Sequence, residues 1–562
     1  MKLRHLEIQN FRGITNLKLD MGDTTVLIGE NNTGKTAVLD AMRFALRDVR
    51  SRHGCAFDTY DFHLSHVQPE PTNALPISIN LTFREDKPDE WTKEQKTHLN
   101  RAKILQIDES GCASVTLKVG ACFDSDEHDY VHSWEFQNLN GIALSGISDS
   151  AINLLHNEVS YYYLSALRDA AKHFDAKGTF WRPFLKESQL TPENREAIEE
   201  KLAEVNKLII SSHESFSKVV ERLEEVKDVI SLNDSGNLVS VDAIPARLFD
   251  ILAKAQVSLN SGTGAKIPVG RHGEGTQSLA VLTLFSAFLQ VWGKGVPIIA
   301  LEEPESHLHP SAVRALWQLI EKIPGQKIIS THSGDLLSEV PSESIVRLYR
   351  NNGCVASKRL KDVHLDDKQR RQFDYHIRQA RGELLFARCW ILGEGETEVT
   401  LIPELARSLD KNLEKSGIRC IAYRQSDISL FIQIADAMGI HWIAIPDSDS
   451  QGLTDQVKIR SSLEGRNERD IHFPLSEENI EIHLCVNGFA NVYEKFLTEE
   501  SRRKITVATS DPEYFKQLAK AIPKKHKIAA VHDVVDKIRL GATVPPLLEN
   551  AIDAAITWVD SQ

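Results

Sequence analysis

Residues 29–36 have the sequence Gly-Glu-Asn-Asn-Thr-Gly-Lys-Thr, which fits the phosphate-binding pattern G-x-x-x-x-G-K-[ST]. An apolar run, Thr24 to Ile28, precedes this loop, and the sequence predicts a helix from about Lys35 to Leu46. The glycines of such a loop let backbone N–H groups surround a phosphate at a helix N-terminus. The lysine adds a positive charge near the outer phosphates, and the last hydroxyl is offered to Mg²⁺. The pattern predicts a nucleotide site that includes Gly29, Asn31, Asn32, Gly34, Lys35 and Thr36.

Two more parts of this site are predicted far downstream. Residues 297–305, Pro-Ile-Ile-Ala-Leu-Glu-Glu-Pro-Glu, form an apolar strand that ends in two carboxylates. Such a pair holds Mg²⁺ and polarises the attacking water, roles that we assign to Glu302 and Glu303 respectively. The next strand, Lys327 to Ser330, leads into Thr-His-Ser and places His332 where it could contact the γ-phosphate. A lone histidine after a strand is otherwise usually structural.

These motifs resemble the ABC-type ATPase heads of the SMC and RecF kind, as does Asn10-Phe11-Arg12 before the phosphate loop. Residues 273–278, Gly-Glu-Gly-Thr-Gln-Ser, are similar to the signature loop of that family, although they match Leu-Ser-Gly-Gly-Gln poorly. The resemblance implies that ATP is sandwiched between two protomers, with Gly273, Gly275 and Gln277 as nucleotide contacts. Glu302 stands where many relatives have Asp, which leaves the turnover rate open.

A second set of carboxylates follows two predicted strands in the C-terminal part of the chain. Glu394 and Glu398 come directly after the strand Cys389–Leu392, and Asp447 and Asp449 come after the strand His441–Ile445. Because the carboxyl ends of parallel strands meet at one edge, we expect these groups to lie together. Mutual repulsion favours a Mg²⁺ or Mn²⁺ site of oxygen ligands. The alternative is a capping turn at residues 447–449 and an ordinary strand-to-helix loop at residues 394–395.

The pattern Glu-Gly-x-Thr-Glu followed by Asp-x-Asp resembles the Toprim domain of topoisomerases, primases and certain nucleases. An ABC-type head joined to a C-terminal Toprim domain resembles the OLD (overcoming lysogenization defect) family of ATP-dependent nucleases, which includes the Gabija nuclease subunit and some retron effectors. This resemblance implies that Glu394, Glu398, Asp447, Asp449 and Glu481 are metal ligands. It also implies a late basic residue, which we assign to Lys527, although Lys524 or Lys525 could align instead.

The sequence predicts an α/β protein with an ABC-type P-loop domain and a Toprim domain. We expect the N-terminal part of the ATPase domain at residues 1–170, a helical dimerisation insertion at 171–240, the C-terminal part of the ATPase domain at 241–381 and the Toprim domain at 382–562. Short β-rich runs between about residues 73 and 136 predict a sheet within or beside the first domain. Apolar residues at helical spacing from about 191 to 232 predict a helical hairpin, which is either a packed arm or a dimerisation element.

Composition restricts the class of protein without naming its function. The chain has 562 residues, 41% of them hydrophobic and 26% charged, which excludes a largely disordered protein. Seven scattered cysteines argue against a disulfide framework or a thiolate zinc site. The sequence has neither a long apolar run nor an apolar signal core, so we expect no membrane span and a cytoplasmic location. The net charge of −13 does not favour nucleic-acid binding, but metal ions can offset carboxylates in a nuclease.

The resemblance implies an ATP-binding, metal-dependent DNA endonuclease with antiphage function. ATP and Mg²⁺ or Mn²⁺ are the expected cofactors, and DNA, a homodimer or tetramer, and an accessory helicase or retron reverse transcriptase with its noncoding RNA are the expected partners. Whether ATP activates or inhibits cutting stays open. Two alternatives also stay open: a Toprim ribonuclease that acts on tRNA or another RNA, and an ATP-driven DNA repair clamp whose Toprim site is not catalytic.

Overall fold

The computed structural model describes residues 1–50, 55–64, 70–126, 128–165, 191–212, 258–260, 266–292, 296–351, 353–363, 365–379, 382–424, 426–511 and 513–561. The chain divides into two compact units. The first unit comprises Met1–His156 and Gln326–Gln562, and the second comprises Asn157–Gly325.

An antiparallel sheet forms much of the N-terminal part of the first unit. Its strand order is β2-β1-β4-β6-β5, and β7 also pairs with β6. In β4, Ile77, Ile79, Leu81 and Phe83 are buried, and the polar residues between them are half-exposed. This alternation buries one face of the sheet in the core and explains why the β-rich runs of the sequence predict it correctly. The elements here are β1 (Leu3–Phe11), β2 (Ile14–Asp20), β4 (Ile77–Arg84), β5 (Gln106–Ile107), β6 (Ala113–Asp124), β7 (Asp129–Gln137), α2 (Lys93–Arg101) and α3 (Ala151–Glu158).

Parallel strands carry the phosphate loop in the same unit. Strand β3 (Thr24–Ile28) lies between β12 (Gln326–Ser330) and β13 (Ile345–Asn351) and is parallel to both, whereas β14 (Cys354–Arg359) is antiparallel to β13. Helix α1 spans Lys35–Leu46, so the predicted helix is confirmed. Val26, Leu27 and Ile28 are fully buried, as expected for a strand that is covered on both faces. The helices α11 (Gly334–Leu337) and α12 (Asp367–Gln379) complete this part.

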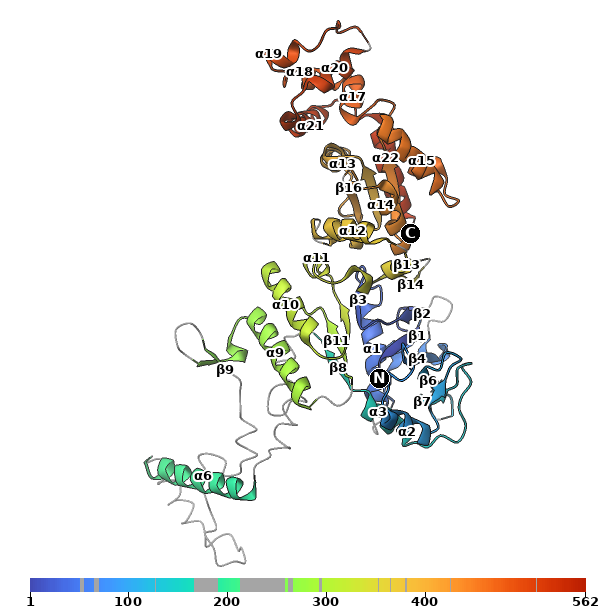
Figure 1. Ribbon diagram of the computed structural model, residues 1–562, viewed down its shortest axis with the longest axis vertical. Coiled ribbons are helices and arrows are strands. Elements are labelled where there is room, and N and C mark those ends of the chain that lie inside the picture. Colours follow the sequence, from blue (N-terminus) through green and yellow to red (C-terminus); the bar gives the residue numbers. More distant parts are fainter. Residues whose placement is uncertain are drawn as a thin grey trace, which may run out of the picture. The chain divides into compact units, whose positions relative to one another are not determined.

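The second unit contains a parallel pair of strands, β8 (Tyr161–Leu164) and β11 (Ile298–Glu302), with the helices α9 (Glu274–Trp292) and α10 (Pro310–Lys322) beside them (Figure 1). Strands β9 (Ser258–Asn260) and β10 (Lys266–Pro268) form an antiparallel hairpin. Helix α6 (Pro192–Ser212) covers the first part of the predicted helical hairpin, and residues 213–232 of that prediction lie outside the described residues. Within the described part of the chain, no helix combines the length and apolar character needed to cross a membrane.

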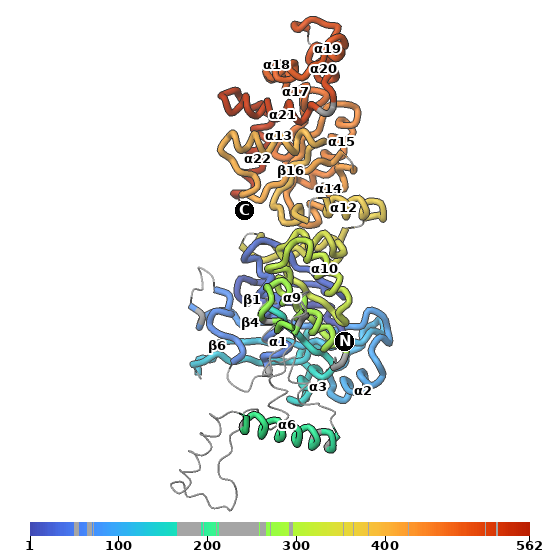
Figure 2. The backbone as a smooth tube through the Cα atoms, turned by 90° about the vertical axis from the view of Figure 1, so that its left-hand side faces the viewer, coloured from blue at the N-terminus to red at the C-terminus, as the bar shows by residue number. Residues whose placement is uncertain are grey.

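The first strand of the predicted second α/β region begins at Cys389, where the sequence predicts a strand. Its three strands are all parallel, in the order β16-β15-β17, with β15 (Cys389–Gly393) between β16 (Ile418–Ala422) and β17 (His441–Ile445). The helices α13, α14, α15 and α22 lie around this sheet (Figures 1 and 2). The helices of the region are α13 (Glu396–Ser408), α14 (Ile428–Met438), α15 (Ser450–Ser461), α16 (Glu468–Ile471), α17 (Ile480–Leu484), α18 (Ala490–Glu494), α19 (Glu499–Arg502), α20 (Glu513–Ala521), α21 (Lys524–Arg539) and α22 (Pro546–Asp560).

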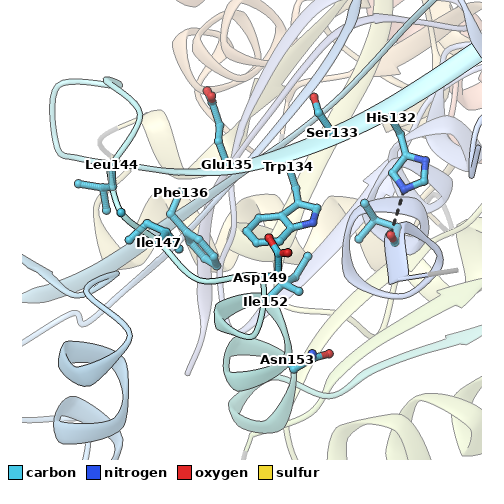
Figure 3. Close-up of a pocket in the computed structure, with 12 residues that line it drawn as sticks. His132, Ser133, Trp134, Glu135, Phe136, Leu144, Ile147, Asp149, Ile152 and Asn153 are labelled. Atoms are coloured by element: carbon cyan, nitrogen blue, oxygen red, sulfur yellow. Dashed lines mark hydrogen bonds between the residues drawn. The ribbon is translucent and has the colours of Figure 1, made fainter. Parts of the chain in front are cut away.

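A cavity of about 750 Å³ lies against the outer strand β7 and the residues around α3 (Figure 3). Trp134, Phe136 and Asp149 contribute to its lining, and the imidazole of His132 hydrogen-bonds to the carbonyl oxygen of Val49 at 3.1 Å. None of the predicted site residues lines this cavity, so it plays no part in the two sites described below.

Candidate nucleotide and metal sites

The phosphate loop starts where β3 ends. Gly29 has a φ of 148°, and a Cβ atom there would lie 2.2 Å from the carbonyl oxygen of Leu348. Only glycine fits this position, because both its backbone conformation and its close approach to β13 exclude a side chain. Gly34, with a φ of 92°, immediately precedes α1. The loop therefore curls tightly between the strand and the first turn of the helix.

The ammonium group of Lys35 lies inside this loop. Lys35 is 6% exposed, and its Nζ donates hydrogen bonds of 2.8 Å to the carbonyl oxygens of Gly29 and Glu30. Thr36 is exposed on the first turn of α1, and that turn carries no acidic residue. A helix N-terminus with a buried cation and no carboxylate favours an anion. The described loop therefore has the properties needed to bind phosphate.

His332 emerges at the same end of the sheet as the phosphate loop. Ser330 is paired with Leu27 in the parallel register of β12 and β3, and the N–H of Thr331 donates to the Leu27 carbonyl oxygen at 3.1 Å. The exposed His332 follows directly. The structure therefore brings His332 close to the start of the loop along the sheet edge.

The two downstream glutamates belong to the second unit. Glu302 is the last residue of β11, and the hydroxyl of Tyr163 donates a 2.6 Å hydrogen bond to its Oε2. The parallel register pairs Ala300 with Tyr163 and so brings the two side chains to the same end of the strands. Glu303 has a φ of 42°, and Ser306 donates to its carboxylate at 3.4 Å. The backbone therefore turns sharply between the two carboxylates.

The signature-like residues lie at the start of α9 in the second unit. The amide of Gln277 donates a 2.6 Å hydrogen bond to the carbonyl oxygen of His272. Gly275 lies against the loop after β11, because a Cβ atom there would be 3.4 Å from the carbonyl oxygen of His307. His307 also pairs with Glu274 at 3.1 Å. The structure thus places Gly273, Gly275 and Gln277 at a helix start next to the loop that carries the glutamates.

Glu394 and Asp447 follow neighbouring parallel strands. The β15–β17 register pairs Gly393 with Ile445, so both acidic residues emerge at the carboxyl edge of the sheet. Asp447 is 6% exposed. The parallel register thus accounts for the juxtaposition that the sequence predicts.

Glu398 folds back over the end of the central strand. Its carboxylate accepts a 3.0 Å hydrogen bond from the Gly395 N–H, and the residue is 3% exposed. A Cβ atom on Gly393 would lie 2.6 Å from the Cβ of Glu398, so a glycine is required there for this approach. Asp449 caps α15, since its Oδ1 accepts a 2.8 Å hydrogen bond from the Gly452 N–H. Glu398 and Asp449 therefore have local structural roles in addition to their predicted ones.

Glu481 joins this edge from a separate helix. It is 5% exposed on α17, where the Thr397 hydroxyl donates to its Oε1 at 3.3 Å and Lys527 Nζ lies 3.0 Å from the same oxygen. Thr397 directly precedes Glu398 on α13, so the contact ties Glu481 to the strand-end carboxylates. Of the three candidate lysines, Lys527 is the one seen to make this contact, and the side chains of Lys524 and Lys525 lie outside the described residues.

The carboxylates at this edge are hard to ionise together. Burial, followed by the negative charges of Glu481 and Glu394, raises the pKa of Glu398 to about 7. Burial also raises the pKa values of Asp447 and Glu394, reinforced by the charges of their acidic neighbours. Divalent cations stabilise ionised carboxylates in such a setting.

The unpaired oxygen atoms at this edge fit a hard metal ion. Glu394 Oε2 and Asp447 Oδ1 are buried and accept no hydrogen bond from any residue that the structure describes. Carboxylate oxygens are the ligands that Mg²⁺ and Mn²⁺ prefer. Among the described side chains, no three His, Cys, Asp or Glu residues are arranged as a ready-made chelating group. The donor set therefore fits Mg²⁺ or Mn²⁺ chemically, although the carboxylates are not preorganised around one point.

Sequence reasoning missed three side chains at these sites. Tyr163 contacts Glu302, Thr397 contacts Glu481, and Tyr423 lies beside Glu394 at the end of β16. Tyr163 lies in the Tyr-Tyr-Tyr-Leu run before residue 165, a local signal without evident chemistry. Thr397 is the threonine of the Glu-Gly-x-Thr-Glu pattern, but its contact with Glu481 is not evident from the sequence. The position of Tyr423 follows from strand register alone.

One arginine connects the phosphate-binding sheet to the C-terminal α/β region within the first unit. Arg347 on β13 is 4% exposed and donates 2.9 Å hydrogen bonds to the carbonyl oxygens of Met438, Gly439 and Ala387. Nearby, Arg388 lies 3.5 Å from the Glu30 carboxylate of the phosphate loop and directly precedes β15. The loop and the strand that carries Glu394 are therefore linked through a short path.

Two family models match the chain. One, described as "Protein of unknown function (DUF2813)", matches residues 1–383. The other, described as "Overcoming lysogenization defect protein-like, TOPRIM domain", matches residues 385–449. The second match includes Glu394, Glu398, Asp447 and Asp449 and ends before Glu481 and Lys527.

Three relatives are similar along most of their length. The "Uncharacterized protein YbjD" of Escherichia coli (strain K12) is 26% identical over 584 residues, covering 100% of this chain and 99% of that protein. The "OLD nuclease" of Thermus scotoductus is 23% identical over 509 residues, covering 86% and 89% respectively. The "Endonuclease GajA" of Bacillus cereus is 23% identical over 462 residues, covering 80% and 75%.

Proposed function

Because the chain belongs to the DUF2813 family and carries the Toprim domain of the OLD family, we propose that it is an ATP-regulated, divalent-metal-dependent DNA endonuclease. The observation that carries this proposal is the set of buried carboxylates at the carboxyl edge of β15 and β17, with Glu481 and Lys527 beside them. The names of two relatives, an OLD nuclease and an endonuclease, support the same reaction class.

Each residue at the edge has a task in phosphodiester hydrolysis. Glu394, Glu398, Asp447, Asp449 and Glu481 would hold two ions of Mg²⁺ or Mn²⁺. Bound ions of this kind supply charge neutralisation at the phosphate and a more acidic water. Lys527, held by Glu481 at 3.0 Å, stabilises negative charge on the scissile phosphate. The burial of Glu398 and Asp447 keeps bulk water away from their carboxylates.

ATP is the regulatory ligand in this proposal. Lys35, Thr36 and the loop glycines bind the phosphates, Glu302 and Glu303 serve the metal and the water, and His332 contacts the γ-phosphate. Gly273, Gly275 and Gln277 complete the site of a second protomer in a homodimer or a larger homo-oligomer. The contacts of Arg347 and Arg388 support a route from the phosphate loop to the nuclease strand.

A plasmid cleavage assay tests the nuclease proposal. Supercoiled DNA is incubated with the purified protein in EDTA, Mg²⁺ or Mn²⁺, with and without ATP. Wild-type protein is expected to nick or linearise the plasmid only with metal, and Glu394→Gln and Asp447→Asn are expected to lose this activity. The matched control is Glu396→Gln, an exposed carboxylate on the same helix start, which should cut normally.

The same assay separates the alternatives. Equal cutting by wild type and both carboxylate variants would overturn the nuclease proposal, as would cleavage in EDTA. Degradation of tRNA without DNA cleavage would show that the substrate is RNA and not DNA. Lys35→Ala shows the direction of ATP control, because it removes the cation of the phosphate loop without changing the carboxylate edge.

We place this nuclease in cytoplasmic antiphage defence, with an accessory helicase or a retron reverse transcriptase and its noncoding RNA as possible partners. The support is the resemblance to the OLD family. Phage plaque counts on cells that carry the wild-type gene are expected to fall, and the Asp447→Asn gene should restore them. Equal plaque counts with the two genes would contradict the defence role.

A further inference from the structure

Tyr423 lies beside the predicted metal ligand Glu394. Strand β16 ends at Ala422, but its pairing with β15 continues, because the Tyr423 N–H donates to the Gly393 carbonyl oxygen at 3.0 Å and the Arg424 N–H donates to that of Glu394 at 2.9 Å. Tyr423 is 2% exposed. Its hydroxyl is buried and has no hydrogen-bond partner among the described residues.

Tyr493 has the same properties on another side of the site. It is fully buried on α18 and packs in the core that includes Ile480 and Leu484, which flank Glu481 on α17. Its hydroxyl is likewise buried and unpaired within the described part of the chain. Two buried phenol groups without a described partner therefore lie on different elements of the region that holds the carboxylates.

Different carboxylates act on the two buried hydroxyl groups. Burial raises the pKa of Tyr423, and the negative charges of Asp455, Glu394 and Asp447 raise it further. For Tyr493, burial is again the main cause of a raised pKa, followed by the charge of Glu481. Both phenols therefore keep their protons at neutral pH and are hydrogen-bond donors.

Donors and acceptors are left unsatisfied in the same region. A buried hydroxyl without a hydrogen-bond partner destabilises the folded state. Glu394 Oε2 and Asp447 Oδ1 are buried and unpaired within the described residues as well. Residues that hydrogen-bond to metal ligands normally fix the orientation of those ligands. A hydrogen bond from such a hydroxyl to Glu394 or Asp447 would satisfy a donor and an acceptor together.

We propose that the hydroxyls of Tyr423 and Tyr493 are positioning groups, which donate hydrogen bonds to the metal-holding carboxylates and fix their orientation. Tyr423 serves Glu394 and Asp447 at the strand ends, and Tyr493 serves Glu481 and Glu398. This inference rests on the proposed metal-dependent nuclease site and extends it to two residues without any motif in the sequence.

Direct Mn²⁺ binding tests the inference without relying on cleavage. The EPR signal of free Mn²⁺ is titrated with full-length protein in the absence of nucleotide, and Asp447→Ala defines the binding that belongs to the carboxylate edge. Tyr423→Phe and Tyr493→Phe are each expected to raise the dissociation constant about tenfold. The matched control is Tyr514→Phe, whose hydroxyl donates instead to Glu494 at 2.7 Å and which should bind within about twofold of wild type.

Thermal unfolding in EDTA distinguishes positioning from packing. Removal of an unpaired buried hydroxyl should leave the apparent Tm of each variant unchanged or slightly higher. Mn²⁺ binding by both variants at wild-type affinity would overturn the inference while leaving the nuclease proposal intact. A lowered apparent Tm together with weakened binding would also overturn it, because the hydroxyl would then be structural. Equal binding by wild type and Asp447→Ala would reject both the metal site and this inference.

Discussion

At the scale of single residues, Tyr163 shows how the second unit prepares one carboxylate for its predicted task. Its hydroxyl holds Oε2 of Glu302 at 2.6 Å, and strand pairing fixes both backbones. A carboxylate that accepts a hydrogen bond from a fixed hydroxyl loses rotational freedom. This contact gives a chemical role to a tyrosine-rich run that the sequence leaves unexplained.

We predict that Tyr163→Phe raises the Mg²⁺ concentration needed for half-maximal ATP hydrolysis about three- to tenfold, because Glu302 loses its orienting donor. The rate at saturating Mg²⁺ should change much less. A titration of steady-state ATP hydrolysis with Mg²⁺ measures both quantities. Tyr162→Phe is the control, since the ring of Tyr162 packs against Phe285 and Phe288 and Phe keeps those contacts. An unchanged Mg²⁺ requirement in Tyr163→Phe would show that the hydrogen bond is incidental.

His441 makes the stability of the C-terminal region depend on pH. Its ring stacks on Trp558 with a centroid distance of 4.2 Å, and burial, reinforced by Arg466, lowers its pKa to about 4. Between this value and the ordinary pKa near 6.5, the unfolded chain binds the proton more readily than the folded chain. The contribution of His441 to the free energy of unfolding is therefore fully present above about pH 6.5 and is lost as the pH falls towards 4.

We expect His441→Phe to reduce this acid sensitivity. Phe keeps an aromatic ring against Trp558 but does not titrate, so the variant should lose about 1–2 kcal/mol less stability than wild type between pH 7 and pH 4.5. Urea unfolding followed by tryptophan fluorescence at the two pH values gives the comparison. The same pH dependence in both proteins would rule out His441 as the cause.

At the scale of elements, Arg347 connects β13 to the strands that carry the carboxylate edge. Burial lowers its pKa to about 10, so the guanidinium still carries its charge at neutral pH. Three carbonyl oxygens accept its hydrogen bonds. A lysine has the charge but lacks the planar group that reaches three acceptors.

We predict that Arg347→Met destabilises the joined elements by about 2–4 kcal/mol, because the three carbonyl groups lose their donor, and that Arg347→Lys recovers little of the loss. Limited proteolysis near residues 380–388 should become faster in both variants. Arg370→Met is the control, because Arg370 is 45% exposed and lies 3.9 Å from its partner Glu343. Equal rates of proteolysis in Arg347→Met and wild type would show that Arg347 does not hold these elements together.

Elements with strong local patterns could be predicted from the sequence, and contacts between elements could not. The phosphate-loop motif predicts the start of α1, and two apolar runs followed by carboxylates predict β11 and β17. The α/β fold and the C-terminal Toprim domain are confirmed. Tyr423 and Thr397 were missed because register and packing bring them to the edge. The domain limits and the roles of the site residues stay predictions.

At the scale of the whole molecule, the nucleotide site is incomplete in one chain if ATP lies between two protomers. Lys35 then belongs to one protomer and Gln277 to the other in each composite site. A mixed dimer of Lys35→Ala and Gln277→Ala chains therefore contains one site with both defects and one intact site.

We predict that each of these variants alone hydrolyses almost no ATP, whereas an equimolar mixture regains about a quarter of the wild-type rate, as random pairing requires. ATP hydrolysis after subunit exchange measures this recovery, with each variant at the same total concentration as the control. No recovery after demonstrated exchange would contradict a site shared between protomers, because both residues would then act within the same chain. Near-normal hydrolysis by one variant alone would instead exclude that residue from the site.

We propose that Glu394, Asp447 and Glu481 hold common metal ions at the end of β15 and β17. Fe²⁺ with ascorbate and peroxide cleaves a protein backbone next to the bound iron, so it maps the site directly. We predict fragments that end near residues 394–398, 447–449 and 479–483, which disappear with excess Mg²⁺ and in Asp447→Ala. Cleavage that is absent from these three segments, or that is unchanged in Asp447→Ala, would contradict this proposal.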